Sequence, residues 1–221
     1  MNFIFVCATE RDAPQFWGGA RLAKSPVLYT GPPAAFHGIF ANRLGLGIVY
    51  NRALKLYESV PNAILVFVHD DVTIEDANIL RKLEESEYDV IGLAGATELD
   101  MTPPVLWHKN HPPQKSGAVA HTDGRDIWMA SYGTFRKSCA VLDGLFLAVR
   151  LEAVVKAGIR FDEQFDFHFY DLDFTLQCSK AGLKVGTEPI WVVHAGLGEF
   201  NNDGWMANQS RFLAKWGGAG A

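Results

Sequence analysis

The sequence has little cysteine and no dense basic segment. Its 221 residues include three cysteines, which lie far apart and lack the spacing of a metal-binding finger. A disulfide framework is therefore disfavoured, and a reducing, cytoplasmic compartment is expected. The formal net charge is -5, and no run of Lys and Arg is present. This charge pattern disfavours a nucleic-acid partner.

Long hydrophobic runs are also missing. No stretch reaches the length of a transmembrane helix, and the apolar N-terminus is too short for a signal peptide and has no basic leader. A cytoplasmic location follows as an expectation, with peripheral attachment to the inner face of a membrane left open. Hydrophobic residues make up 48% of the chain, which is enough for the full core of one sizeable domain.

Apolar runs that suit strands and apolar patterns that suit helices alternate along the first hundred residues. Strands are expected at 3–8, 27–30, 63–71 and 89–94, with helices at 46–58 and 74–85. This order predicts an α/β fold with a mostly parallel central sheet flanked by helices. Residues 98–125 lack periodicity and predict a mobile lid. After it come strands at 128–132, 140–142 and 146–149, helices at 151–157 and 170–181, an extended stretch at 184–193, and a helix at 205–216.

The apolar run 63–68 ends abruptly in His69, Asp70 and Asp71. A strand of this composition is typical of one buried on both faces, which places the carboxylates at its C-terminal edge, where α/β folds bind ligands. Adjacent carboxylates suit a hard divalent cation such as Mg²⁺ or Mn²⁺. A plain strand-to-helix turn stays open as an alternative, with residues 73–76 capping the next helix.

A second acidic pair, Asp171 and Asp173, lies among aromatic residues at the start of a predicted helix. Either carboxylate could cap that helix, because its N-terminal dipole favours negative charge. Aromatic surroundings would also desolvate a carboxylate and tune it as a general base. His194 ends another apolar run; it is a core residue unless the fold brings it to Asp71.

The order of these motifs resembles the family 2 group of nucleotide-sugar glycosyltransferases, which have the GT-A fold. The resemblance runs from about residue 45 to 194. It includes a D-x-D-like motif at 69–71, an Asn-bearing helix at Asn51, a glycine segment at 142–150, an F-D-x-x-F element at 161–165, an E-D-x-D-like motif at 170–173 and the late His194. Two positions depart from the pattern: His69 replaces the first Asp of D-x-D, and Tyr170 replaces the Glu of E-D.

The resemblance implies roles for these residues. Asp71 and His194 would bind a divalent cation, Mn²⁺ or Mg²⁺. Asp171 would be the general base, with Asp173 as the fallback. Contacts to the nucleotide donor are expected from Thr9, Glu10, Arg43, Asn51, His69 and Asp70, and contacts to the acceptor from Asp143 and Gly144.

The implied protein is a single GT-A-type domain with a nucleotide-binding half at 1–96, an acceptor and catalytic half at 97–204, and a C-terminal helix and tail at 205–221. It would move a sugar, with inversion, from a nucleoside-diphosphate sugar to a carbohydrate or glycolipid hydroxyl, with a UDP-sugar favoured as donor. His108, His111 and His121 are either acceptor contacts or ordinary loop histidines, and a zinc site formed by them has no evident fourth ligand.

Two alternatives stay open. A sugar-phosphate nucleotidyltransferase would need a glycine-rich basic loop after the first strand, and residues 8–12 contain no glycine. A non-catalytic carbohydrate- or nucleotide-binding protein that keeps the fold is supported by the departures at His69 and Tyr170.

Overall fold

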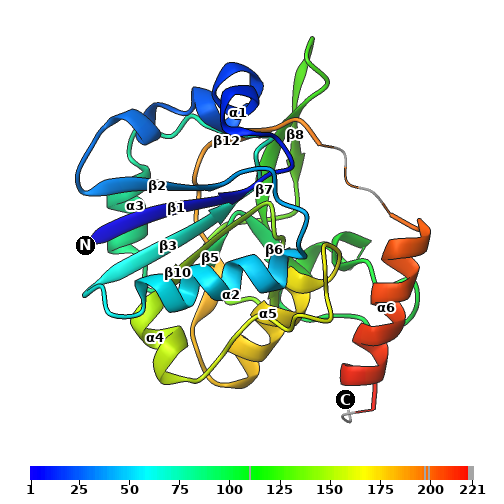
Figure 1. Ribbon diagram of the computed structural model, residues 1–221. Coiled ribbons are helices and arrows are strands. Elements are labelled where there is room, and N and C mark those ends of the chain that lie inside the picture. The colour runs from blue at the N-terminus through cyan, green and yellow to red at the C-terminus, as the bar shows by residue number, and fades with distance from the viewer. Residues whose placement is uncertain (110, 197, 199, 219–221) are drawn as a thin grey trace.

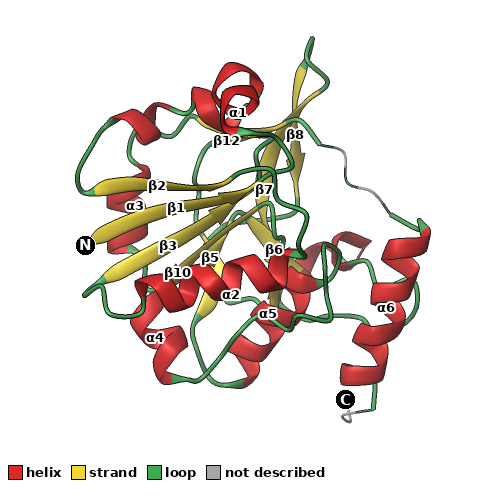
Figure 2. Cartoon of the chain, viewed as in Figure 1, coloured by secondary structure: helices red, strands yellow, loops and turns green. Residues whose placement is uncertain are grey.

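Two mixed β-sheets and their flanking helices make up the chain (Figures 1 and 2). A computed structural model describes residues 1–109, 111–196, 198 and 200–218. The helices are α1 (Ala13–Gly19), α2 (Leu46–Tyr57), α3 (Ile79–Glu85), α4 (Leu151–Lys156), α5 (Tyr170–Lys180) and α6 (Asp203–Trp216). Within these described residues, no helix is both long and apolar enough to cross a bilayer.

The larger sheet has the strand order β11-β5-β10-β3-β1-β2. Its strands are β1 (Asn2–Ala8), β2 (Ala34–Ile39), β3 (Ala63–Val68), β5 (Val90–Gly92), β10 (Phe146–Arg150) and β11 (Val185–Thr187). β10 is antiparallel to both neighbours, β3 and β5, and the other neighbouring pairs are parallel. The expected α/β class is confirmed, with a sheet that is mixed rather than purely parallel.

The smaller sheet has the order β4-β12-β7-β6-β9, and β8 pairs with β7 outside this path. Its strands are β4 (Val72–Ile74), β6 (Ala94–Ala96), β7 (Lys115–Thr122), β8 (Ile127–Ser131), β9 (Val141–Leu142) and β12 (Val192–His194). The chain passes from β3 in the larger sheet to β4 in the smaller one through residues 69–71 alone. The D-x-D-like motif is therefore the junction between the two sheets.

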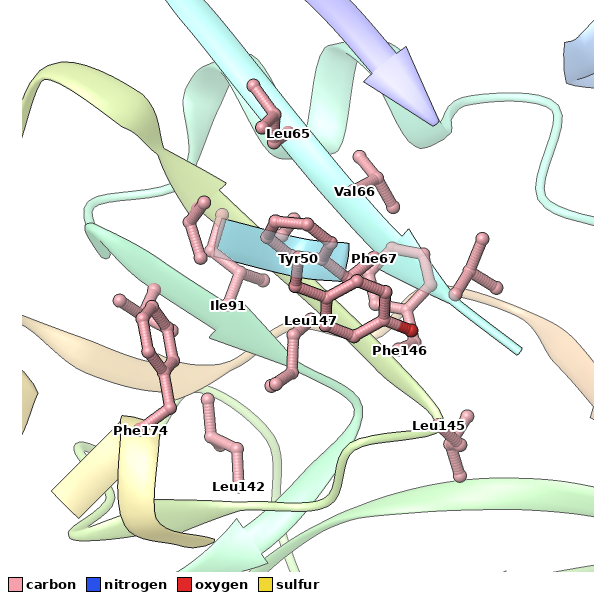
Figure 3. Close-up of a cluster of buried hydrophobic side chains, with 14 of the residues drawn as sticks. Tyr50, Leu65, Val66, Phe67, Ile91, Leu142, Leu145, Phe146, Leu147 and Phe174 are labelled. Carbon is pink, nitrogen blue, oxygen red and sulfur yellow. The ribbon is translucent and has the colours of Figure 1, made fainter. Parts of the chain in front are cut away.

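A continuous apolar core supports this junction. Every residue of β3 is buried, because helices cover both faces of the sheet; α2 lies on its near face and α3 on its far face in Figure 1. Tyr50 of α2 packs on Phe67 of β3, with ring centroids 4.5 Å apart, and Phe161 stacks on Phe174 at 4.0 Å. Figure 3 shows Tyr50 among the side chains of β3 and β10. Full burial of each such side chain contributes about 1.5–3 kcal/mol.

Two predicted elements near the N-terminus are wrong. Residues 27–30 are not a strand: Pro26–Tyr29 form a 3₁₀ turn, and the edge strand that pairs with β1 on the side away from β3 is β2, which follows the two prolines. The helix expected at 74–85 begins only at Ile79. β-branched Val72, Thr73 and Ile74 instead pair with β12, as their strand preference favours, so the alternative of a helix cap at 73–76 is wrong.

The predicted lid contains a strand of the smaller sheet. β7 consists of small residues with weak strand preference, but it pairs with β6, β8 and β12, and this tertiary pairing outweighs propensity. Gly117 allows the close pairing with β6, since a Cβ at this position would lie 1.9 Å from the Leu93 carbonyl oxygen. Residues 115–122 are therefore part of the scaffold rather than of a mobile lid. Two 3₁₀ turns, Trp107–Lys109 and Pro112–Gln114, precede β7.

Candidate functional site

A cavity of about 890 Å³ opens where the two sheets meet. His69 and Asp71 line it from the junction between β3 and β4, His194 from β12, and Asp171 from the first turn of α5. Its wall is rich in aromatic residues, including Trp107, Trp128, Tyr132, Phe167, Phe200 and Trp205. Among the described residues that line it there is no Lys or Arg. The cavity therefore combines carboxylates, imidazoles and aromatic surface without a basic side chain.

Strand pairing brings Asp71 and His194 together. His194 is paired with Val72, the residue after Asp71, and the Ala195 amide donates to the Asp71 carbonyl oxygen at 3.0 Å. His194 Nε2 lies 3.3 Å from Asp71 Oδ2. His69 joins this pair: one ligand atom from each of the three side chains lies within 4.8 Å of the others.

Two atoms of this cluster are buried without a hydrogen-bond partner. They are Asp71 Oδ1 and His194 Nδ1. An unpaired buried polar atom costs about 1–3 kcal/mol, so such atoms call for a ligand. Burial acts to raise the pKa of Asp71, but His194 and His69 outweigh it and bring the pKa below its usual value. Burial lowers the pKa of His69, which favours the neutral imidazole that binds metals. The donor set and its unpaired atoms fit a divalent cation.

Asp171 is held by a backbone amide at the other side of the cavity. Its Oδ2 accepts a hydrogen bond from the Gly144 amide at 2.7 Å. Burial, and then the neighbouring charge of Asp143, raise the pKa of Asp171 to about 7. A carboxylate with this pKa can accept a proton near neutral pH and is suited to general-base chemistry. Asp143 and Gly144 line the same cavity, and Asp143 Oδ1 accepts from the Leu145 amide at 3.1 Å.

Asp70 points to a separate polar cluster beside the cavity. Its Oδ2 accepts from Thr9 Oγ1 at 2.6 Å and from Arg11 Nε at 3.2 Å. Glu10 and Arg43, both largely exposed, form an ion pair of 3.0 Å. The structure thus places Thr9, Glu10 and Asp70 just after the ends of β1 and β3, with Arg43 paired to Glu10. Arg11, directly after Glu10 in the sequence, also belongs to this cluster and was not among the predicted residues.

Asn51 instead has a structural role, in holding two segments of the chain together. Its side-chain amide donates to the Phe161 carbonyl at 2.9 Å and to Glu163 Oε1 at 3.0 Å, and its Oδ1 accepts from the Phe161 amide at 2.9 Å. These bonds attach α2 to the F-D-x-x-F element. With its donors and acceptor engaged in this way, Asn51 is not available as a donor-binding residue, and that expectation is corrected.

Asp173 is also placed away from the cavity. It is 0% exposed, lies 2.8 Å from Lys215 Nζ, and accepts hydrogen bonds from Trp216 Nε1 at 2.8 Å and Gln177 Nε2 at 2.7 Å. A carboxylate closed in this manner cannot reach an acceptor, so the fallback base is corrected to an anchor for α6. The sequence contained no sign that Lys215 and Trp216 would cover it.

Only two of the three histidines of the predicted lid reach the cavity. His108 and His121 line the cavity, whereas His111 is exposed outside it. His121 stacks on Trp128 at 6.1 Å, and its Nδ1 lies 3.2 Å from the Gly196 carbonyl oxygen. Trp107 packs on Tyr132 at 4.8 Å. These aromatic wall residues could not be predicted from the sequence, because tryptophan and tyrosine in a loop or edge strand form no recognisable motif.

Comparisons with known proteins agree with the fold described above. No curated protein is significantly similar to the chain in sequence. A mutant of Drosophila β1,4-galactosyltransferase 7 in complex with manganese, UDP-Gal and xylobiose is 12% identical, with a TM-score of 0.52 over 93% of this chain and 79% of that chain. The mannosyltransferase PcManGT from Pyrobaculum calidifontis, in complex with GDP-Man and Mn²⁺, is 14% identical, with a TM-score of 0.52 over 100% of this chain and 65% of that chain.

GalNAc-T7 with UDP, GalNAc and Mn²⁺ is 11% identical, with a TM-score of 0.53 over 99% of this chain and 48% of that chain. At such low identity these likenesses show the fold alone, and they confirm the expected GT-A type. The sequence model of the family described as glycosyltransferase-like matches residues 46–216. That span includes the junction between the sheets, both acidic motifs and His194, and it places this chain in the glycosyltransferase-like family.

Proposed function

We propose that the protein is a metal-dependent, inverting glycosyltransferase that moves a sugar from a nucleoside-diphosphate sugar to the hydroxyl of an uncharged carbohydrate acceptor. One observation carries this proposal. A carboxylate whose pKa is raised to about 7, Asp171, shares an aromatic cavity with a His and Asp cluster that holds unpartnered buried atoms. Such a pair of sites suits chemistry in which one side releases a diphosphate and the other activates a hydroxyl.

The residues His69, Asp71 and His194 would hold the cation. When bound there, a divalent cation supplies the positive charge that stabilises the diphosphate as it departs. The cavity supports a bound cation, because its described lining residues include no Lys or Arg to offset phosphate charge. Two imidazole donors favour Mn²⁺ over Mg²⁺, because Mg²⁺ prefers oxygen ligands in near-ideal octahedral geometry.

Asp171 would act on the acceptor. Its carboxylate takes the proton of the attacking hydroxyl as the new glycosidic bond forms. The Gly144 amide, at 2.7 Å from Oδ2, fixes the carboxylate for this transfer. A single in-line displacement from the side opposite the diphosphate inverts the anomeric centre. Asp143 and Gly144 would lie beside the acceptor.

Thr9, Asp70 and Arg11 would bind the nucleoside next to the cavity, with Glu10 and Arg43 at its outer edge. The carboxylate of Asp70 suits a ribose hydroxyl, since its second oxygen remains free to accept. Three structural neighbours carry UDP or GDP nucleotides with Mn²⁺, which supports a nucleoside-diphosphate donor. A UDP-sugar stays the favoured donor.

The acceptor is inferred from the cavity wall. Aromatic rings such as Trp128, Tyr132 and Phe167 offer flat apolar faces on which sugar rings can lie. An acceptor that carries phosphate or carboxylate would meet Asp143 and Asp171 with no described lining Lys or Arg to compensate. Neutral glycosides, free or at the head of a lipid, are therefore the expected class.

The first test is calorimetry of UDP and GDP binding with and without Mn²⁺. Asp71→Asn should weaken Mn²⁺-dependent binding by about 100-fold or more, because even groups that only orient metal ligands contribute about 10–100-fold. Asp76→Asn is the matched control: this neighbouring carboxylate pairs with Lys82 at 2.6 Å and does not line the cavity, so Mn²⁺-dependent binding should stay unchanged.

The second test incubates the protein with a panel of nucleotide sugars and neutral glycosides and follows release of the nucleoside diphosphate. Release that needs Mn²⁺ supports the proposal. Formation of pyrophosphate from a nucleoside triphosphate and a sugar phosphate would identify a nucleotidyltransferase instead. Tight binding of nucleotide without turnover of any donor would identify a non-catalytic binding protein.

A further inference from the structure

The two departures from the family pattern meet in space. His69 and Tyr170 are 101 residues apart in the chain, yet His69 Nε2 lies 2.9 Å from Tyr170 Oη. The two rings are tilted by 37° relative to each other, with centroids 6.4 Å apart. One histidine and one tyrosine thus occupy, in mutual contact, the positions where the pattern has two carboxylates.

The direction of this hydrogen bond follows from the next one. Tyr170 Oη also lies 2.8 Å from the Gly144 carbonyl oxygen, which can only accept. A phenol has a single proton, so that proton is given to Gly144 and the oxygen is left to accept from His69. His69 Nε2 must then carry its own proton, and Nδ1 is the ring nitrogen that keeps a lone pair.

Gly144 connects this arrangement to Asp171. Its carbonyl accepts from Tyr170, while its amide donates to Asp171 Oδ2 at 2.7 Å. No side chain fits here, because a Cβ on Gly144 would lie 2.4 Å from Tyr170 Oη and 2.7 Å from Asp171 Cβ. Tyr170 is only 2% exposed, and Tyr50 packs against its ring at 5.8 Å, so the hydroxyl has little freedom to move away.

We propose that Tyr170 is a positioning residue that sets the His69 tautomer, so that Nδ1 of His69 is presented to the divalent cation held with Asp71 and His194. This inference rests on the cation site of the proposed function. His69 and Tyr170 then form one unit, in which neither replacement is useful without the other. Groups that hydrogen-bond to a metal-binding histidine fix its orientation in this way.

The test is a double-mutant cycle on Mn²⁺ affinity, measured by calorimetry without a sugar substrate. Tyr170→Phe removes only the hydroxyl and should weaken Mn²⁺ binding by about 10–100-fold. His69→Ala should weaken it at least as much. The double variant should bind no more weakly than His69→Ala, because the hydroxyl acts only through the imidazole.

The matched control is Tyr57→Phe. Tyr57 Oη lies 2.9 Å from His37 Nδ1, the same kind of contact at the same distance, and neither residue lines the cavity. Mn²⁺ affinity should be unchanged in this variant. Wild-type affinity in Tyr170→Phe would overturn the inference and leave the proposed function standing, whereas unchanged binding in Asp71→Asn would overturn the cation site itself.

A second measurement needs no substitution at Tyr170. Histidine labelled with ¹⁵N at Nδ1 or at Nε2 is incorporated, and pulsed electron paramagnetic resonance of bound Mn²⁺ reports which nitrogen is coordinated. The signal of His69 is the one lost in His69→Ala. Coordination through Nδ1 is the expected result, and coordination of His69 through Nε2 would overturn the inference whether or not Tyr170→Phe folds.

Discussion

The two faces of α5 present the same residue type to opposite environments. Asp171 faces the cavity, where its bonding partner is the Gly144 amide and its pKa is raised to about 7. Asp173, two residues further along, is closed off by Lys215 and Trp216 of α6. The difference arises from what each face packs against. A carboxylate left without a cation remains available for proton transfer, whereas a carboxylate paired with a lysine becomes a structural anchor.

The largest effect that would test this contrast is loss of turnover in Asp171→Asn. The amide keeps the shape of the side chain but cannot take the acceptor's proton, and loss of a general base costs about 10²–10⁴-fold in rate. Nucleotide binding should change little, because Asp171 is not part of the Thr9, Asp70 and Arg11 cluster. Initial rates of transfer and calorimetry of UDP with Mn²⁺ check the two statements.

Asp173→Asn supplies the comparison within that experiment, since it makes the same change on the other face. Full activity in Asp171→Asn would end the assignment of the base. An inactive but folded Asp173→Asn would show that the two faces had been assigned in reverse.

The next effect is on stability and belongs to Asp173. Removing one partner of a buried ion pair costs about 3–5 kcal/mol, because the other charge is left uncompensated. Lys215 also contacts Asp162 Oδ2 at 2.7 Å and its side chain is 28% exposed, so about 3 kcal/mol is expected for Asp173→Asn. Urea unfolding measures this loss, and Asp171→Asn should show none of it. Equal free energies of unfolding for wild type and Asp173→Asn would contradict the anchoring role.

A smaller effect is the pH dependence of transfer. Asp171 must be ionised to accept a proton, so kcat/KM should rise about tenfold per pH unit below 7 and level off above it. Asp173→Asn should keep this profile. The residual activity of Asp171→Asn should lack the rise. A profile that is flat between pH 5 and 7 in wild type would contradict the assigned base.

The ionisation of Asp171 also changes the free energy of unfolding, which falls with rising pH while the rate of transfer rises. The pKa of Asp171 is raised in the folded state from its ordinary value of 3.8, so the folded chain binds the proton more tightly. The stabilisation from this proton is complete below pH 4 and is lost as the pH rises through 7. An asparagine at position 171 does not titrate, so Asp171→Asn does not lose stability as the pH rises through 7. Its free energy of unfolding, relative to wild type, should therefore increase between pH 4 and 7.

The sequence predicted the elements that have strong periodicity and missed those that depend on distant pairing. β3, α2 and α5 have long apolar patterns, and their bounds in the structure differ little from the prediction. β7 could not be predicted, because its small residues form a strand only through pairing with three others. Residues 115–122 of the predicted lid belong to this strand for the same reason, and mobility of the rest of the lid stays a prediction.

The site shows a similar division. Motif order located Asp71, His194, Asp171 and Gly144, which line one cavity in the structure. It misjudged Asp173 and Asn51, since their partners Lys215 and Phe161 are remote in sequence. Contact between His69 and Tyr170 was also beyond reach, because two unusual residues in separate motifs reveal nothing about their distance.

The smallest expected effect concerns the exposed edge of the Thr9, Asp70 and Arg11 cluster. Arg43 pairs with Glu10 at 3.0 Å, with the two side chains 68% and 85% exposed. Exposed ion pairs contribute about 0–1 kcal/mol, so Arg43→Ala should leave the urea midpoint nearly unchanged.

The same Arg43→Ala variant should raise the KM for the nucleotide sugar only a few-fold if Arg43 contacts the base, because water competes for so exposed a group. Arg11→Ala is the informative partner: it removes a direct bond to Asp70, so its KM should rise more than that of Arg43→Ala. If Arg43→Ala impairs binding more than Arg11→Ala does, the nucleoside lies at the outer edge of the cluster rather than over Asp70.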